Sequence, residues 1–308
     1  KLIYFDLIKK EKKFEVPLIN SVDALFVLSL DSIFIVPSRT NDLILLDSNG
    51  SVLNKWYIKD PINDSIDYEY YQIIAYKDKL NNLNIFLELS NNYSPPACYL
   101  DSKVIYLKIN MNGKVVYRKK YAKYPDKFFK NEYLNFDCKF ELAKNNYFAI
   151  HYYKENAIYL YNIDLILEKE IKFQSRYIDE FVPITEEEKK DRKFSSTQQI
   201  ERPFYCNLYY DKFRDLYYLQ AIHNQKYKNE DGTLNNYFDR SWSIIVFDND
   251  FKILDEIYME PKKYLFKNMV VTKDGLLISN NVESNPEFDP NLLQFTLFEV
   301  KIKWGNYL

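Results

Sequence analysis

Apolar and polar residues alternate along most of the chain in short runs, and polar turns separate the runs. In four places a β-branched or aromatic run, a turn rich in Asp, Asn or Gly, and a second such run follow one another. These places are residues 42–56, 104–117, 157–171 and 243–257. Alternation with period two predicts β-strands, and the turn residues adopt conformations that β-branched residues avoid. Each segment therefore predicts an antiparallel hairpin.

The spacing of these hairpins indicates a repeated unit. Their turn markers Asp47, Asn110, Asn162 and Asp248 are 63, 52 and 86 residues apart. Four-stranded units of about 50 residues are typical of propeller blades. The 308 residues divide into six units of about 51 residues or five of about 62. We therefore expect an all-β protein, a six-bladed β-propeller, with five blades as the alternative count.

The two ends of the chain are both predicted to be strands. Residues 2–7 and 14–18 near the start, and the long alternating run 294–304 near the end, are expected to lie in one shared sheet. Pairing of N- and C-terminal strands would then close the propeller. No linker-like change in composition interrupts residues 1–308, so we expect a single domain.

One segment departs from the β pattern. Thr185 and Glu188 fit a capping box, and acidic residues precede basic ones up to Lys193. The segment has no apolar face. We expect a short charged insert near residues 185–195, on the surface between blades.

Composition excludes several function classes. With Lys+Arg 42 and Asp+Glu 44, the net charge is −2, which excludes the broad basic field that nucleic-acid binding needs. No apolar run approaches the ~18 residues of a membrane-spanning helix. Two His and five Gly leave little room for His-based metal sites or phosphate loops, and no hydrolase, zincin or Walker motif is present. We expect no nucleic-acid partner, no transmembrane segment, no cofactor and no metal; the oxygen-rich loop 280–289 departs from the EF-hand spacing.

The three cysteines show no metal-binding spacing. Cys98, Cys138 and Cys206 include no Cys-x-x-Cys pair, and their number is odd. They are expected to be small buried hydrophobes, with one disulfide and one remaining thiol as the alternative.

The two histidines differ in their surroundings. His151 lies within an alternating strand, where a structural role is expected. His223 ends an apolar strand and opens a polar loop, which is a suitable place for an acid–base group. No nucleophile or carboxylate partner is visible in the sequence, so His223 is a weak catalytic candidate.

Loops from several blades converge on one face of a propeller and form a concave site there. The loops 91–98, 197–206 and 223–242 are the candidates for ligand contact. Their predicted ligand-binding residues are Tyr93, Arg202, Tyr205, His223, Arg240 and Trp242. The aromatic rings would stack on the ligand, and the guanidinium groups would pair with anions. For Arg202, a structural ion pair with Glu201, or with Asp211 of a neighbouring strand, is favoured over contact with a ligand.

Three C-terminal segments together resemble a known family: residues 210–218, residues 242–256, and residues 271–279 followed by 293–299. In this order they are similar to a domain-of-unknown-function family of six-bladed β-propeller lipoproteins from the cell envelope of anaerobic gut bacteria. The resemblance is clearest over residues 200–304. It implies export, an extracytoplasmic location, periplasmic or outer-membrane-anchored, and a lipid anchor upstream of residue 1, but no reaction.

These observations favour a non-enzymatic binding module of the cell envelope, whose partner is a glycan, a peptide or an envelope protein. An enzyme is the first alternative, namely a polysaccharide lyase or hydrolase that acts at the axial funnel with His223. A structural subunit of an outer-membrane assembly is the second.

Overall fold

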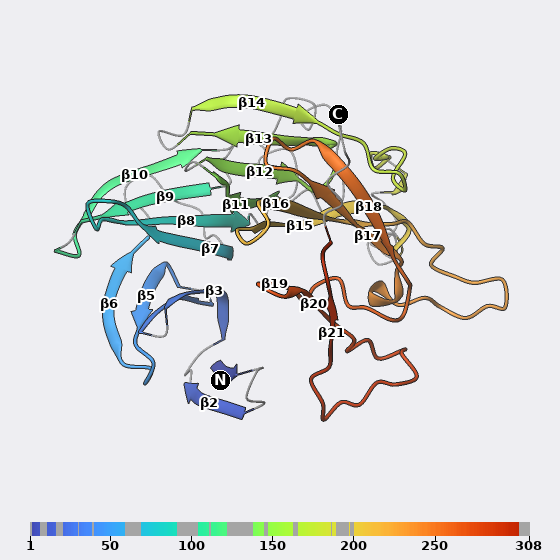
Figure 1. The fold of residues 1–308 in the computed structure, drawn as a ribbon, viewed down its shortest axis with the longest axis horizontal. Coiled ribbons are helices and arrows are strands. Elements are labelled where there is room, and N and C mark those ends of the chain that lie inside the picture. Colours follow the sequence, from blue (N-terminus) through green and yellow to red (C-terminus); the bar gives the residue numbers. More distant parts are fainter. Residues whose placement is uncertain are drawn as a thin grey trace. The chain divides into compact units, whose positions relative to one another are not determined.

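A computed structural model of the chain shows antiparallel sheets joined by turns and loops (Figure 1). The structure describes residues 2–6, 11–16, 21–29, 31–38, 40–58, 69–90, 104–110, 112–121, 138–144, 147–162, 166–185, 187–188, 197 and 200–301. The chain divides into two compact units, Lys1–Lys130 and Asn131–Leu308, and each is described by itself.

The first unit contains three sheets. The smallest pairs β1 (Leu2–Asp6) with β2 (Glu11–Val16). The second has four strands in chain order: β3 (Val22–Ser29), β4 (Ser32–Pro37), β5 (Asp42–Leu46) and β6 (Val52–Tyr57). The third also has four: β7 (Glu69–Lys77), β8 (Leu83–Ser90), β9 (Val104–Ile109) and β10 (Val115–Tyr121).

The second unit contains three more sheets, again with neighbours in chain order. The first consists of β11 (Cys138–Leu142), β12 (Phe148–Tyr152), β13 (Ala157–Tyr161) and β14 (Leu167–Lys172). The next consists of β15 (Phe204–Asp211), β16 (Leu216–Ile222), β17 (Trp242–Phe247) and β18 (Ile253–Met259). The last consists of β19 (Met269–Thr272), β20 (Gly275–Ser279) and β21 (Phe295–Phe298).

The four predicted hairpins are confirmed as β5–β6, β9–β10, β13–β14 and β17–β18. One device forms their turns: an Asp or Asn side chain accepts hydrogen bonds from backbone N–H groups further along the turn. In β17–β18, for example, Asp248 Oδ1 accepts from the N–H of Asp250 at 3.0 Å and of Lys252 at 2.8 Å. The same contacts with the second and fourth following residues occur at Asp47 and Asn110. The turn is thus specified locally by one residue.

The prediction of six blades is wrong, because the described residues form five blade-like sheets of three or four strands, so the fold is a β-propeller with five blades. The predicted pairing of N- and C-terminal strands is also wrong for these residues. There, β1 pairs with β2, and the last sheet consists of β19, β20 and β21. The sixth unit was expected because the hairpin spacing of 86 residues left room for it. The structure fills much of that room with the connection between β14 and β15, residues 173–203.

The predicted capping box at the charged insert is confirmed. The N–H of Thr185 donates to Glu188 Oε2 at 2.8 Å, and the N–H of Glu188 donates to Thr185 Oγ1 at 3.2 Å. Residues 189–196 of this insert lie outside the described residues.

Burial within a sheet depends on the position of the strand. In the sheet β15–β18, every residue of the inner strands β16 and β17 is buried, whereas most residues of the outermost strand β18 are not. The strand β14 is likewise mostly exposed. The middle strands are covered on both faces, and apolar packing there supplies most of the stabilisation.

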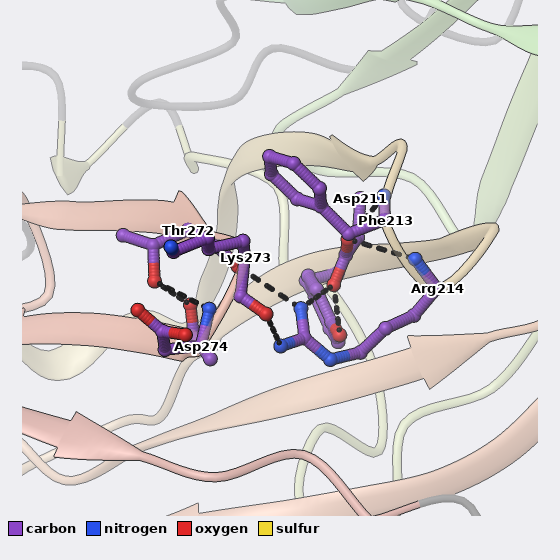
Figure 2. A network of polar contacts seen from close by, with 8 residues as sticks. Asp211, Phe213, Arg214, Thr272, Lys273 and Asp274 are labelled. Atoms are coloured by element: carbon purple, nitrogen blue, oxygen red, sulfur yellow. Dashed lines mark hydrogen bonds and ion pairs between the residues drawn. The ribbon is translucent and has the colours of Figure 1, made fainter.

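A buried ion pair ties the last two sheets together (Figure 2). Asp211 is fully buried and accepts hydrogen bonds from the N–H groups of Phe213 and Arg214, from the Arg214 guanidinium at 2.8 Å and from the Tyr218 hydroxyl at 2.9 Å. The same guanidinium donates to the carbonyls of Thr272 at 3.0 Å and Lys273 at 2.7 Å. Arg214 therefore fastens the β15–β16 turn to the β19–β20 turn.

Candidate functional site

A cavity of about 360 Å³ opens in the second unit where hairpin turns of two neighbouring sheets meet. Its walls come from the β11–β12 turn, from β13, β14 and β16, and from the β17–β18 turn. The lining residues are Ala143, Lys144, Tyr147, Leu160, Glu168, Lys169, Tyr217, Asn249, Asp250 and Phe251. Its size is within the range of small-molecule sites.

One wall of the cavity presents a carboxylate held by two donors. The Tyr147 hydroxyl donates to Glu168 Oε2 at 2.7 Å, and the Asn162 amide donates to Glu168 Oε1 at 2.7 Å. The hydrogen bond from Tyr147, followed by that from Asn162, lowers the pKa of Glu168, and the same contact raises the pKa of Tyr147. Glu168 is therefore an ionised acceptor with a fixed orientation.

A second carboxylate, Asp215, orients two other residues of the lining. Asp215 forms an ion pair with Lys144, and it accepts hydrogen bonds from the Tyr210 hydroxyl at 3.0 Å and the Asn249 amide at 3.1 Å. The contact with Lys144 is the largest of the effects that lower the pKa of Asp215. Two cavity residues, Lys144 and Asn249, are thereby oriented by one anion.

The floor of the cavity is aromatic. The rings of Tyr217 and Phe251 stack with centroids 4.1 Å apart and an interplanar angle of 21°. The Tyr217 hydroxyl also accepts a hydrogen bond from the N–H of Lys144 at 2.9 Å. Both rings are almost fully buried, so their positions are fixed by packing.

Two residues at this cavity and its support have left-handed backbone conformations. Of the four non-Gly residues with positive φ among the described residues, Asp215 (58°) and Phe251 (62°) belong to the cavity and its support. The position of Phe251 in its turn is the one that Gly50 and Gly113 occupy in the hairpins β5–β6 and β9–β10. A bulky residue in this conformation costs about 1–2 kcal/mol relative to glycine. The stack on Tyr217 offsets this cost, and strain of this kind is concentrated at functional sites.

Two of the aromatic residues predicted to bind a ligand lie in the core. Tyr205 and Trp242 are fully buried. The Tyr205 hydroxyl donates to Asn156 Oδ1 at 2.7 Å, and the Trp242 indole donates to the Tyr264 carbonyl at 3.0 Å. Tyr93 and the loop 91–98 lie outside the described residues.

The predicted anion-binding arginines are also buried, and both have structural partners. Arg202 forms a bidentate pair with Glu188, at 2.8 and 3.0 Å, rather than with Glu201 or Asp211. Arg240 is fully buried, donates to the carbonyls of His223 and Arg202, and lies 5.3 Å from the centre of the Phe204 ring. Arg202 thus holds the connection that leads into the sheet β15–β18, and Arg240 ties this connection to the one between β16 and β17.

His223 lies in a polar cluster away from the cavity. Its ring contacts Ser241 Oγ at 3.2 Å through Nδ1 and Ser243 Oγ at 3.0 Å through Nε2. The ring of Tyr177 covers it, with centroids 4.8 Å apart. His151 is fully buried in β12, where a structural role was expected, and its ring stacks on Tyr153.

The two buried histidines give a testable pH dependence. Burial, and then the charge of Lys139, lowers the pKa of His151 to about 3; burial, and then the charge of Arg240, lowers that of His223 to about 4. Below about pH 6.5 the unfolded chain binds protons at both residues, whereas the folded chain does not, so stability falls as the pH decreases. We expect the free energy of unfolding to drop by up to about 1.4 kcal/mol per pH unit for each histidine between pH 6.5 and 5.

Urea unfolding at several pH values measures this drop. In the variant His151→Phe, which removes one of the two groups, the slope should be about half as steep. A stability that is independent of pH over this range would contradict the expectation.

Cys138 and Cys206 are buried thiols, consistent with small hydrophobes, whereas Cys98 lies outside the described residues.

No group of three or more His, Cys, Asp and Glu residues in the described part of the chain is arranged to hold a metal ion. In the loop 280–289, Asn285 caps its own turn by accepting from the N–H of Glu287 at 3.0 Å. None of the helices in the described ranges is long and apolar enough to cross a membrane.

The sequence alone did not reveal the cavity, because its lining combines residues of two hairpin turns with residues of β13, β14 and β16 that lie far apart in the chain. One signal was present: Phe251 stands where the equivalent turns carry Gly50 and Gly113, and a bulky residue there is unusual.

Comparisons with known proteins support the fold and leave the activity open. No protein-family model matches the chain, and no curated protein matches it. A solved structure of a DUF4221 family member from Bacteroides vulgatus is similar over 97% of this chain and 85% of its own, with 22% identity and a TM-score of 0.77. More distant are a protein of unknown function from Bacteroides caccae (10% identity, 92% of this chain and 80% of its own, TM-score 0.47) and a luciferin-regenerating enzyme (10%, 95% and 81%, TM-score 0.46). The chain therefore has a β-propeller fold that it shares with a member of a family of unknown function.

Proposed function

We propose that this protein is a binding module whose ligand, a short glycan, lies in the cavity at the hairpin turns. The observation that carries the proposal is the strained and fixed construction of this cavity: Phe251 and Asp215 adopt unfavourable backbone conformations there. Two anions orient its polar groups in advance of binding, which lowers the entropic cost of association.

The polar groups of the cavity suit a ligand with several hydroxyls. Each oxygen of Glu168 accepts one protein hydrogen bond and retains acceptor capacity for another, so the carboxylate can receive two neighbouring hydroxyl groups. Lys144 and Asn249 are the donors of the same lining. A sugar hydroxyl both donates and accepts, so it can use the acceptor and the donors.

The charge of the lining favours a neutral ligand. Lys144 and Lys169 are matched by Glu168 and Asp250. A strongly charged ligand would gain little from such a balanced set. The lining contains no His, Ser or Cys.

The variant Glu168→Gln tests the site. It keeps the size of the side chain but removes the charged acceptor, and hydrogen bonds to charged groups contribute about 1.5–3 kcal/mol. We expect affinity for the bound sugar to fall by roughly 10- to 100-fold. Isothermal titration calorimetry against a panel of neutral mono-, di- and trisaccharides measures it.

The control is Glu170→Gln, which changes a carboxylate two residues further along β14 that does not line the cavity. It should bind like the unmodified protein. Equal affinity in Glu168→Gln and the unmodified protein, absence of binding to every sugar, or binding of short peptides instead would overturn the proposal.

An extracytoplasmic location with a lipid anchor upstream of residue 1 is part of this proposal. It is supported by the resemblance of residues 200–304 to envelope lipoproteins. Fractionation of cells that express the full-length gene checks it, because recovery in the cytosol would exclude this location.

A further inference from the structure

A second polar cluster lies in the sheet β15–β18, apart from the residues that line the cavity. It joins His223 at the end of β16, Ser241 and Ser243 at the start of β17, and Glu256 in β18. His223, Ser243 and Glu256 are buried, whereas Ser241 is partly exposed. The cluster therefore runs from the interior to the surface.

The hydrogen bonds of this cluster determine which group donates and which accepts at each contact. Glu256 accepts from the hydroxyls of Ser243 at 2.5 Å and Ser175 at 2.7 Å, and from the N–H of Arg176 at 2.6 Å. Since the hydroxyl proton of Ser243 points to the carboxylate, its oxygen is left to accept from His223. His223 must then carry its proton on Nε2.

This tautomer determines the state of the other ring nitrogen. With the proton on Nε2, Nδ1 has a free lone pair 3.2 Å from Ser241 Oγ. The hydroxyl of Ser241 is the donor in that contact. A serine whose proton is accepted by an oriented imidazole has the arrangement of an activated nucleophile.

We propose that Ser241 is a nucleophilic serine with His223 as its general base, and that it reacts with carboxylic esters. Ser243 and Glu256 are positioning residues, which hold His223 in the reactive tautomer. In the first step, Ser241 Oγ bonds to the acyl carbon, its proton passes to His223 Nδ1, and the alcohol leaves with that proton. In the second, His223 Nδ1 takes a proton from water, the hydroxide bonds to the acyl carbon, the bond between that carbon and Ser241 Oγ breaks, and the proton returns to Ser241 Oγ as the acid leaves.

The surroundings keep the imidazole in the form that this step needs. The groups that face His223 are Arg240 from the β16–β17 connection, Tyr177 from residues 173–178, and Glu256 and Tyr258 from β18. Burial and the positive charge of Arg240 lower the pKa of His223 to about 4, so the ring is neutral at pH 7. When it takes the serine proton, Glu256 faces the new positive charge through Ser243.

A fluorophosphonate probe tests the proposal on the intact protein, because it phosphonylates activated serines. We expect labelling of Ser241, located by peptide mass spectrometry, and hydrolysis of p-nitrophenyl acetate that the label abolishes. Ser241→Ala and His223→Asn should each reduce both by at least 100-fold. The matched control is Ser48→Ala, since Ser48 donates directly to the Asp31 carboxylate without a histidine; its rates should be unchanged.

The role of Ser243 has its own measurement. Nitrogen-15 NMR of the imidazole should show the proton on Nε2 in the unmodified protein and a shift of population to Nδ1 in Ser243→Ala, with labelling slowed about 10-fold. Circular dichroism shows whether each variant folds. Absence of labelling in the unmodified protein, labelling that persists in Ser241→Ala, or a proton on Nδ1 in the unmodified protein would overturn the proposal, whatever the variants do.

Discussion

Gly275→Ala is expected to lower the free energy of unfolding by about 4 kcal/mol or more, one of the largest losses available from a single methyl group in this protein. Gly275 begins β20 with φ at +148°, and a Cβ there would lie 2.1 Å from the carbonyl oxygen of Phe298 in β21. That atom belongs to the backbone of the paired strand and cannot rotate away. The three-stranded sheet would have to separate or shift its register.

The control for this substitution is Gly232→Ala. Gly232 also has positive φ, +86°, but its Cβ would meet only the end of the Lys228 side chain at 3.7 Å. It should cost about 1 kcal/mol, the strain of the backbone alone. Denaturant unfolding of both variants compares the two losses of free energy. Equal losses would show that a Cβ at residue 275 does not clash with the backbone of β21.

Asp211→Ala should destabilise the protein by about 3–5 kcal/mol, because it removes one partner of a buried ion pair and leaves the other charge uncompensated. The carboxylate is fully buried and satisfies four donors, two of them backbone N–H groups and one the Arg214 guanidinium (Figure 2). Arg214 would keep its two carbonyl contacts with Thr272 and Lys273 but lose its counter-charge.

A double-mutant cycle with Arg214→Ala separates the pair from its surroundings. Each single variant leaves the other charge without its partner. The free energy of unfolding should therefore fall less in the double variant than the sum of the two single losses. Asp274→Ala is the control, because this exposed aspartate belongs to the neighbouring turn and uses only its N–H in it. A loss below about 1 kcal/mol for Asp211→Ala would show that the pair does not anchor the two turns.

The hairpins were predictable because their cause is local. Period-two alternation placed the strands, and one Asp or Asn per turn accepts the hydrogen bonds that close it, as Asp47 and Asp248 do. The number of blades was not predictable from spacing. A long connection such as residues 173–203 occupies the same length of sequence as several strands.

The burial of the predicted ligand-binding residues was not predictable for a different reason. Alternation shows that a strand has two faces, but it does not show whether both are covered. Trp242 lies in the middle strand β17, where every residue is buried, and Tyr205 lies in the buried first part of β15, so both rings pack in the core. Arg202 was expected to pair nearby in sequence, yet Glu188 reaches it from 14 residues upstream.

By itself, the sequence determined the class of structure and the hairpins, since backbone preferences and turn hydrogen bonds act between residues that are close in the chain. It also excluded a basic nucleic-acid surface and a long apolar span. The tertiary structure alone decided which side chains meet: Tyr147 with Glu168, Lys144 with Asp215, and His223 with Ser241. Such contacts depend on how each strand and sheet packs against its neighbours, and no periodicity along the chain encodes that packing.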